Sequence, residues 1–208
     1  FDLERIEVVK GPQATLFGQG ALVGGINFIQ NRASLSGNEG WVKFDSGDYS
    51  YVRGEAGYNF TLGDAAAVRV ASLLKKRDGY APNVANSPDL MGQDTAAFRV
   101  ALAWEPVDTL RADLILNYEE NDSTGTQFKS GVFAPPGGAL SPYTATANNV
   151  TASQLRSRLG ADREIFSATA NIVWDINDAW SLTSVTSTRS LKNLEAFDSD
   201  GSAMSLLQ

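Results

Sequence analysis

The chain contains neither cysteine nor histidine among its 208 residues. Without cysteine it forms no disulfide and offers no thiol nucleophile or thiolate metal site. Without histidine it lacks the most common general acid–base residue, and no Ser-His-Asp triad can form within these residues. Asp and Glu could still bind a metal or transfer a proton. We nevertheless predict that the chain is not an enzyme and holds no metal or cofactor.

Basic charge and long apolar runs are also scarce. The formal net charge is −7 and the pI is near 4.6, which argues against a nucleic-acid partner because phosphate binding needs a basic surface. No run approaches the roughly 18 apolar residues of a membrane helix, and no charged-then-apolar signal region opens the chain. The chain begins at Phe1 and stops at Gln208 without a closing feature. We therefore expect a piece of a longer protein.

From residue 40 onward, apolar side chains recur with a period of two. The clearest case is "TLRADLILNYE" at 109–119, where Leu110, Leu114 and Tyr118 share one face and Arg111 and Asp113 share the other. Such alternation is typical of strands with one apolar and one polar face. It predicts seven strands, at 40–47, 51–61, 65–78, 95–105, 109–119, 165–175 and 179–192. The pattern in 179–192 is blurred, so its register stays open.

The connections between these strands differ at the two ends. Short polar turns are expected at 62–64, 106–108 and 176–178. Longer connections are expected at 79–94 and 120–163, with another starting near Leu194, and only the turn around 46–50 is short at that end. Long loops at one end and tight turns at the other are typical of transmembrane β-barrels. A soluble β-sandwich, the alternative, has no such asymmetry.

The aromatic residues also favour a membrane barrel. Trp104, Trp174 and Trp180 lie within a few residues of the short turns, and Trp41 is expected at the same end. Tyr80 and Tyr118 lie toward the long connections. Aromatic girdles at both membrane interfaces give this arrangement, and a tilted membrane strand needs about 9–11 residues. We predict an all-β chain that forms about seven antiparallel strands of a larger transmembrane β-barrel.

A glycine-rich stretch, "KGPQATLFGQGALVGGINFI", precedes the first predicted strand of the sheet. Glycine-rich loops often hold phosphates, and residues 18–24 have the spacing G-x-G-x-x-x-G. However, an apolar strand at 26–29 follows the glycines where a nucleotide fingerprint requires a helix, and no Gly-Lys-Ser/Thr is present. We interpret the stretch as a compact strand–turn–strand element with close backbone approach at Gly24 and Gly25.

The segment "ERIEVVKGPQATLFGQGALVGGINFI" closely resembles the end of the plug domain in TonB-dependent outer-membrane receptors. Gln19 and the Gln30-Asn31 pair depart from the common pattern of that family. The tripeptide Asp78-Gly79-Tyr80 is similar to part of the family's first barrel hairpins. Besides the Glu-Arg-Ile-Glu-Val run, the plug motif is matched by Lys10, Gly11, Pro12, Phe17, Gly18, Gly20, Gly24, Gly25 and Asn27.

The resemblance implies two parts and a transport function. Residues 1–33 would be the C-terminal part of a plug, and residues 34–208 the N-terminal part of a wide barrel that the plug seals. Members of the family lie in the outer membrane of Gram-negative bacteria, surrounded by lipid. They import scarce solutes, most often ferric siderophores, with energy supplied through TonB and its inner-membrane complex. The TonB-contacting segment is not expected within these residues. Import of a carbohydrate, cobalamin or haem, and a passive porin or adhesin barrel, remain alternatives.

Two groups of side chains are candidate binding residues. The first lies on the polar faces of the strands, which would line the lumen: Arg53, Glu55, Arg69, Arg99, Arg111, Asp113 and Asn117. The second lies in the connection 120–163, expected to be an extracellular loop that captures the ligand: Phe128, Lys129, Phe133, Tyr143, Arg156 and Arg158. Each could instead be an ordinary solvated residue, and the loop could merely cover the barrel. We also expect residues 6–29 to pack against the polar face.

Overall fold

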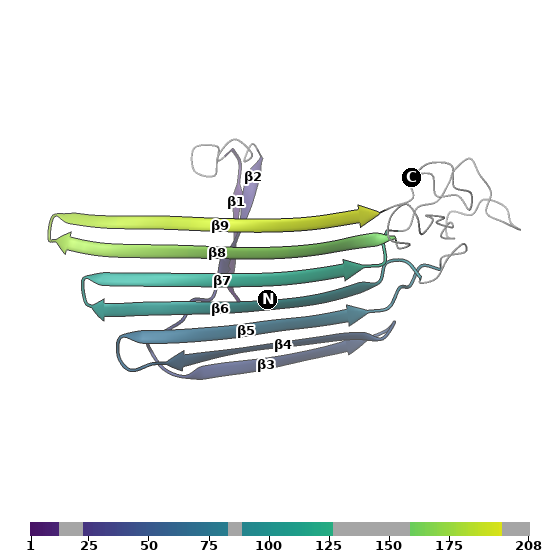
Figure 1. Ribbon diagram of the computed structural model, residues 1–208, viewed down its shortest axis with the longest axis horizontal. Helices are drawn as coiled ribbons and strands as arrows, with labels where there is room; N and C mark the ends of the chain where they lie inside the picture. Colours follow the sequence, from purple (N-terminus) through teal and green to yellow (C-terminus); the bar gives the residue numbers. More distant parts are fainter. Residues whose placement is uncertain (13–22, 83–88, 127–158, 197–208) are drawn as a thin grey trace, which may run out of the picture.

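A computed structural model describes residues 1–12, 23–82, 89–126 and 159–196, and all regular secondary structure in these residues is β-strand. A two-stranded hairpin precedes a seven-stranded antiparallel sheet whose strands follow chain order (Figure 1). The hairpin consists of β1 (Leu3–Lys10) and β2 (Gly24–Gln30). The sheet consists of β3 (Glu39–Gly47), β4 (Tyr51–Thr61), β5 (Ala66–Arg77), β6 (Gln93–Val107), β7 (Leu110–Ser123), β8 (Gly160–Asn177) and β9 (Trp180–Ala196). The all-β antiparallel prediction is confirmed.

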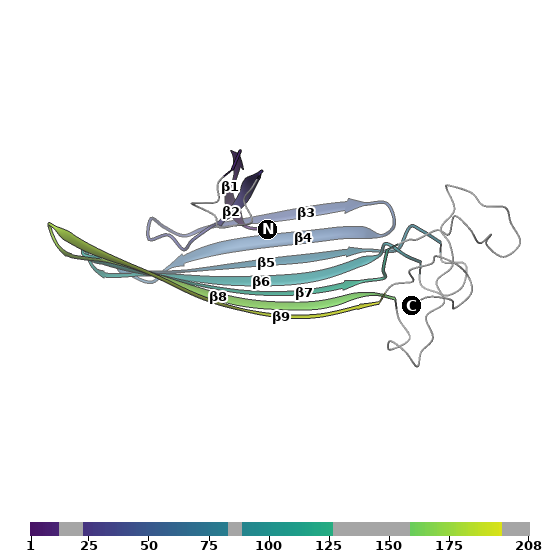
Figure 2. The same cartoon turned by 90° about the horizontal axis from the view of Figure 1, so that it is seen from above.

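The register gives the sheet one polar and one apolar face. Arg53 lies opposite Lys75, Arg69 opposite Asn59, and Arg99 opposite Asn117 on the side that we call the polar face. The other side, the apolar face, carries aliphatic and aromatic side chains that no layer covers (Figure 2). Its exposed aromatic residues include Tyr58, Phe60, Phe98, Tyr118 and Phe166. A soluble sandwich would bury that face against a second sheet, so the exposed apolar face favours a barrel wall.

The two ends of the sheet differ as predicted. Residues 62–65, 108–109 and 178–179 connect strands at one end, and residues 78–92 and 124–159 connect them at the other. Trp104 lies opposite Ala66 at the start of β5, and Trp174 lies opposite Leu110 at the start of β7. Trp180 itself begins β9. These three tryptophans therefore share the short-turn end, as expected.

Trp41 lies near the same end of its strand, as expected, but on the other face of the sheet. It is the third residue of β3 and lies on the polar face opposite Gly57. A Cβ atom at Gly57 would lie 2.7 Å from the indole Nε1 of Trp41. The glycine leaves room for the ring to lie flat against the strand, so Trp41 is directed away from the apolar face.

Several strands are longer than the alternation indicated. β7 reaches Ser123 and β8 starts at Gly160, so the connection predicted at 120–163 shortens to residues 124–159. Leu194 lies within β9 rather than in a connection. Strands β6 to β9 have 14 to 18 residues, more than the ~9–11 that cross a membrane. Polar residues continue the ladder there because strand pairing uses backbone groups and does not require apolar side chains.

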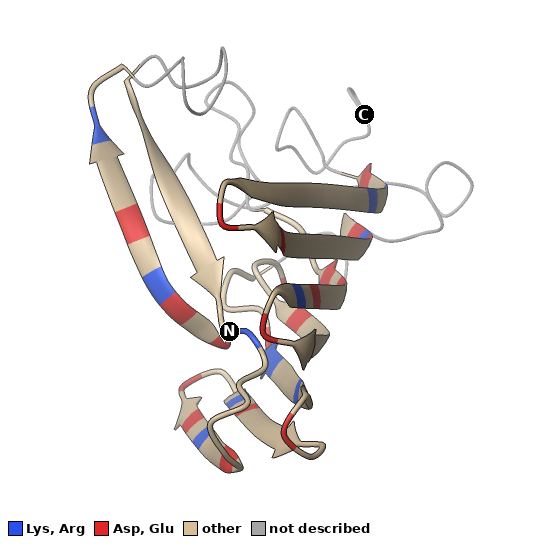
Figure 3. Ribbon diagram, turned by 90° about the vertical axis from the view of Figure 1, so that its left-hand side faces the viewer, with Lys and Arg blue, Asp and Glu red and all other residues tan. Residues whose placement is uncertain are grey.

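The hairpin stands away from the sheet on its polar side (Figures 2 and 3). Ile6, Val8, Ile26 and Phe28 are each more than half exposed. Contacts with the sheet come from the residues just before β1 and just after β2. The expectation that residues 6–29 pack on the polar face was therefore wrong for the hairpin itself, because only its base is fixed there and both strands extend away. The described part of the chain has no helix long and apolar enough to cross a membrane.

Candidate functional site

The polar face of β4 to β7 and the base of the hairpin form the candidate site. Antiparallel pairing places alternate residues of each strand on one side, so separate polar positions along the chain gather on a single surface. All seven residues proposed from the strand pattern lie on this surface: Arg53, Glu55, Arg69, Arg99, Arg111, Asp113 and Asn117. Glu55, Arg69, Arg99 and Asp113 are buried.

A buried ionic cluster joins the chain before β1 to the sheet. The carboxylate of Asp2 accepts hydrogen bonds from Nη2 and Nε of Arg69, at 2.6 and 3.1 Å. Nη1 of Arg99 donates to the backbone carbonyl of Asp2 at 2.8 Å and lies 3.7 Å from its carboxylate. The guanidinium of Arg99 also lies over the ring of Phe1, 4.7 Å from its centroid. These contacts attach the segment before the hairpin to two neighbouring strands.

The cluster keeps Asp2 ionised. Burial alone would raise the pKa of the Asp2 carboxyl. Hydrogen bonds from Arg69 and Asn31, together with the charges of Arg69 and Arg99, outweigh burial and hold that pKa below its usual value. A buried carboxylate is stable only when such partners replace its hydration, and the two-point bond from Arg69 provides that replacement.

A second buried contact fixes the chain after β2. The side-chain amide of Asn59, which is fully buried, donates to the carbonyl oxygens of Ser34 and Gly37 at 2.8 and 2.7 Å. Its oxygen accepts from the backbone N–H of Ser34 at 2.9 Å. Next to it, Ala33 packs into a cluster of small side chains that lets the backbone lie close to the wall. The cluster also contains Ala67, Ala101 and Ala103.

Sequence reasoning did not select Asp2 or Asn59 as candidates. Asn59 did carry a signal, because it is a polar residue at an inward position of the alternating segment 51–61. Asp2 carried none, since it lies outside any periodic segment and its partners are supplied by strands far along the chain. Its backbone has a positive φ of 48°, a conformation that Asp adopts more readily than most residues.

The remaining strand candidates form local pairs. Arg53 contacts Glu55 on its own strand. Arg111 lies 3.2 Å from Asp113 and 2.9 Å from Glu105. Asp113 is also reached by Arg32 at 3.4 Å, which adds a link to the chain after the hairpin. Asn117 connects Arg99, at 2.7 Å, to Ser167 on β8, at 3.3 Å.

The plug-motif residues lie in part within the hairpin. Lys10 pairs with Gly24 across its two strands, and a Cβ atom on Gly24 would lie 2.5 Å from the carbonyl oxygen of Val9. Gly11 has a φ of 88° and donates its N–H to Val23. Pro12 follows it, Gly25 pairs with Val9, and Asn27 donates to Glu7 at 3.3 Å. Outside the described residues lie Phe17, Gly18, Gly20, Phe128, Lys129, Phe133, Tyr143, Arg156 and Arg158.

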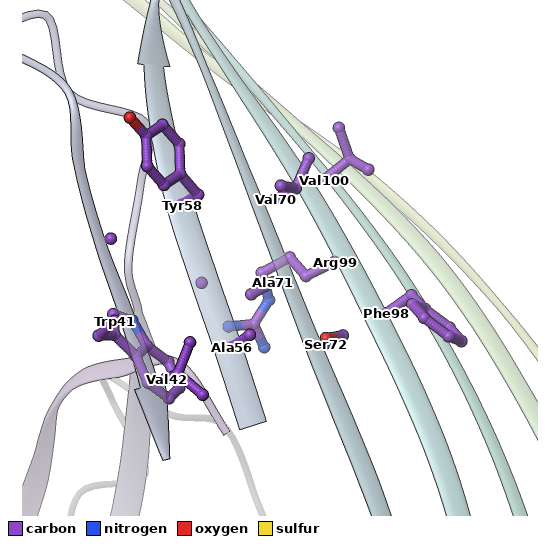
Figure 4. A pocket seen from close by; sticks show the side chains of 12 residues that line it. Trp41, Val42, Ala56, Tyr58, Val70, Ala71, Ser72, Phe98, Arg99 and Val100 are labelled. Carbon is purple, nitrogen blue, oxygen red and sulfur yellow. The ribbon is translucent and has the colours of Figure 1, made fainter. Parts of the chain in front are cut away.

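A hollow of about 710 Å³ belongs mainly to the apolar face and is not part of the candidate site. Figure 4 shows Val42, Tyr58, Val70, Phe98 and Val100 around it. These side chains are at least a third exposed. Its lining suits contact with hydrocarbon and offers few polar groups that could orient a solute.

Comparison with solved structures identifies the fold. The siderophore receptor PiuA from Acinetobacter baumannii matches 93% of this chain, with 22% identity and a TM-score of 0.69. The ferric yersiniabactin uptake receptor FyuA from Yersinia pestis matches 92%, with 20% identity and a TM-score of 0.72. The alcaligin outer-membrane receptor FauA from Bordetella pertussis matches 92%, with 13% identity and a TM-score of 0.66. No protein-family model matches the chain.

The chain spans only 26%, 29% and 26% of the lengths of these three proteins. The matched share of this chain exceeds nine tenths in each case. All three proteins are named as receptors and none as an enzyme. At identities of 22% or less, the likeness shows a shared fold: this chain is built like one part of an outer-membrane siderophore receptor.

Proposed function

We propose that the chain is part of a TonB-dependent receptor in the outer membrane of a Gram-negative bacterium. Residues 1–33 form the end of its plug, and residues 34–208 form the first strands of its barrel. The receptor imports a scarce solute by energy-coupled transport, and a ferric siderophore is the ligand that we assign first. The observation that carries the proposal is the buried contact of Asp2 with Arg69 and Arg99.

This contact supports a plugged barrel over an open one. In a passive porin the polar face of the wall lines a water-filled channel. Here the segments just before and just after the hairpin cover part of the polar face. The first segment is held through Asp2 and Arg69, and the second through Ser34 and Asn59. The uncovered apolar face on the opposite side suits outer-membrane lipid. A wall that binds its own N-terminal segment supports a plug.

The ligand class is supported by the names of the structural neighbours, since PiuA is called a siderophore receptor and FyuA a ferric yersiniabactin uptake receptor. Carbohydrate, cobalamin or haem import would use the same plugged architecture and remains the alternative. TonB and its inner-membrane complex are the proposed partners for energy coupling. We assign their contact segment to a part of the receptor outside the 208 residues.

Uptake by the full-length receptor tests the proposal. The gene is expressed in a strain that lacks its own siderophore receptors, and the cells are offered a panel of radiolabelled ferric siderophores. We expect accumulation of at least one complex, lost when a protonophore dissipates the proton gradient or when TonB is deleted. Uptake that survives both treatments would indicate a passive barrel. Uptake of haem, cobalamin or a carbohydrate alone would retain the mechanism and change the ligand.

A further inference from the structure

Three basic side chains gather on the polar face at the end of the long connections. We propose that Arg53, Lys75 and Arg77 form a subsite for an anionic, oxygen-rich ligand, which makes a negatively charged ferric complex the preferred cargo. The inference rests on the proposed function and names the charge class of its ligand.

The register brings these cations together. Arg53 on β4 lies directly opposite Lys75 on β5. Arg77 follows two residues later on β5 and therefore faces the same side. The three residues line a hollow of about 580 Å³ together with Tyr49 and Tyr51, and Asp48 is the one carboxylate in its lining. The hollow thus has a positive lining at the outer end of the wall.

The cations are incompletely compensated within the described residues. Like charges placed directly opposite one another across two strands are destabilising. Arg53 is paired with Glu55 and also lies 3.9 Å from Asp45. Nη2 of Arg77 donates to the carbonyl oxygen of Met91 at 2.9 Å. Lys75 has no hydrogen bond or ion pair within the described part of the chain. The Nε atoms of Arg53 and Arg77 are buried and have no acceptor there. Oxygen atoms of a ligand would supply the missing acceptors and relieve the repulsion.

The surroundings suit a ligand that enters from the end with the long connections. The hollow is lined by Asp48 and Tyr49 from the turn between β3 and β4, and by Arg77 and Gln93 at the adjoining ends of β5 and β6. The rings of Tyr49 and Tyr80 lie 5.7 Å apart, and the guanidinium of Arg77 lies 5.0 Å from the centroid of Tyr80. Cations beside aromatic faces favour an anion that itself carries flat rings, as a ferric catecholate does.

The chain offers a matched control. Lys75 and Lys76 are neighbours on β5, but Lys76 points to the opposite face, where it lies 3.9 Å from Asp94. Replacing either lysine with glutamine removes one positive charge from the same strand. Because Lys75 has no partner within the described residues, K75Q is expected to leave insertion of the receptor into the outer membrane unchanged. Heat-modifiable migration of the receptor in gel electrophoresis checks this.

The experiment titrates the purified full-length receptor with two ferric complexes, a trianionic tris-catecholate and a neutral trihydroxamate. We expect tighter binding of the trianionic complex. K75Q should weaken that binding about tenfold, the size of one lost charge-assisted contact, and R77Q should weaken it in the same direction. K76Q should match the unaltered receptor, and none of the variants should change binding of the neutral complex.

The subsite is overturned if K75Q binds the trianionic complex as tightly as K76Q does. It is also overturned if the receptor binds only the neutral complex, or neither one. The proposed function is judged separately by energy-dependent uptake in cells. Energy-dependent uptake with no effect of K75Q would keep the function and remove the subsite. Weakened binding with uptake that ignores a protonophore would keep the subsite and remove the function.

Discussion

Asp2 and Arg69 are separated by 67 positions in the chain, yet they form a buried ion pair with 2.6 Å between Oδ1 and Nη2. Removing one member of such a pair leaves the other charge buried and uncompensated. We expect D2N in the full-length receptor to lower its unfolding free energy by about 3 kcal/mol. The measurement is denaturant or thermal unfolding of the receptor in detergent.

E4Q is the control, because Glu4 pairs with Arg5 on the surface and should change stability by less than about 1 kcal/mol. Equal stability of the two variants would contradict the role given to Asp2.

The same carboxylate predicts an acid-sensitive junction. Because the pKa of Asp2 in the folded chain lies below its ordinary value of 3.8, its contribution is fully present above that value. The contribution is then lost as the pH falls further, through the folded pKa. The unaltered receptor should lose more stability than D2N as the pH is lowered below 3.8, when both are followed by unfolding at a series of pH values. Parallel pH curves for the two proteins would show that Asp2 does not titrate in this way.

The tryptophans should report the lipid boundary. Trp104, Trp174 and Trp180 are about half or more exposed at the short-turn end, whereas Trp41 lies on the polar face. In full-length receptors that each retain a single tryptophan, lipids carrying a quencher near the headgroup should reduce the fluorescence of the first three. Trp41 should be protected and serves as the internal control. Quenching of Trp41 as strong as that of Trp104 would contradict the assignment of the two faces.

The isolated 208-residue chain should not persist as a folded monomer in water. In the described residues its sheet has two open edges, at β3 and β9, and Val42 on the apolar face is 84% exposed. Open edges and uncovered apolar surface promote association. We expect aggregation or broad amide resonances in buffer, and a well-dispersed spectrum of sharp lines would refute the prediction.

The long connection between β7 and β8 is predicted to contribute to ligand capture. Replacing residues 124–159 in the full-length receptor with a short Gly-Ser linker keeps both strands and their pairing. Whole-cell binding of a transported ferric siderophore should weaken, because the connection contains aromatic and basic residues suited to an anionic ligand. A linker of the same design in place of the turn at 62–65, at the opposite end of the sheet, provides a control for general loop changes. Unchanged affinity would indicate that the long connection only covers the barrel and does not bind the ligand.

Period-two alternation was sufficient to predict which face each strand residue occupies. Once Leu110 and Leu114 are assigned to one side, Arg111 and Asp113 must lie on the other. The same pattern could not predict where β7 ends. No apolar residue alternates with Asn121, Asp122 and Ser123 in the sequence. They remain in the strand because their backbones pair with β6 and β8.

The parts that sequence reasoning missed depend on contacts between distant segments. Asp2 has no periodic context, and its role comes from Arg69 and Arg99, which two different strands supply. The hairpin was predicted as an element but misplaced, because local pattern does not determine the direction in which β1 leaves the wall. The face that Trp41 occupies was missed for a related reason: the space beside Gly57 forms only when β3 and β4 are paired.

The single-sided distribution of arginine also protects the molecule against errors of assembly. Arg69 lies in the first half of β5, and Arg99 lies near the middle of β6. If a hairpin inserted with one strand displaced by a single position, one of these guanidinium groups would enter the hydrocarbon, at a cost of about 2–4 kcal/mol near the bilayer midplane. Such a penalty makes the misaligned register less stable than the native one. The residues that hold the plug segment in the finished receptor would therefore also disfavour a displaced strand register during insertion.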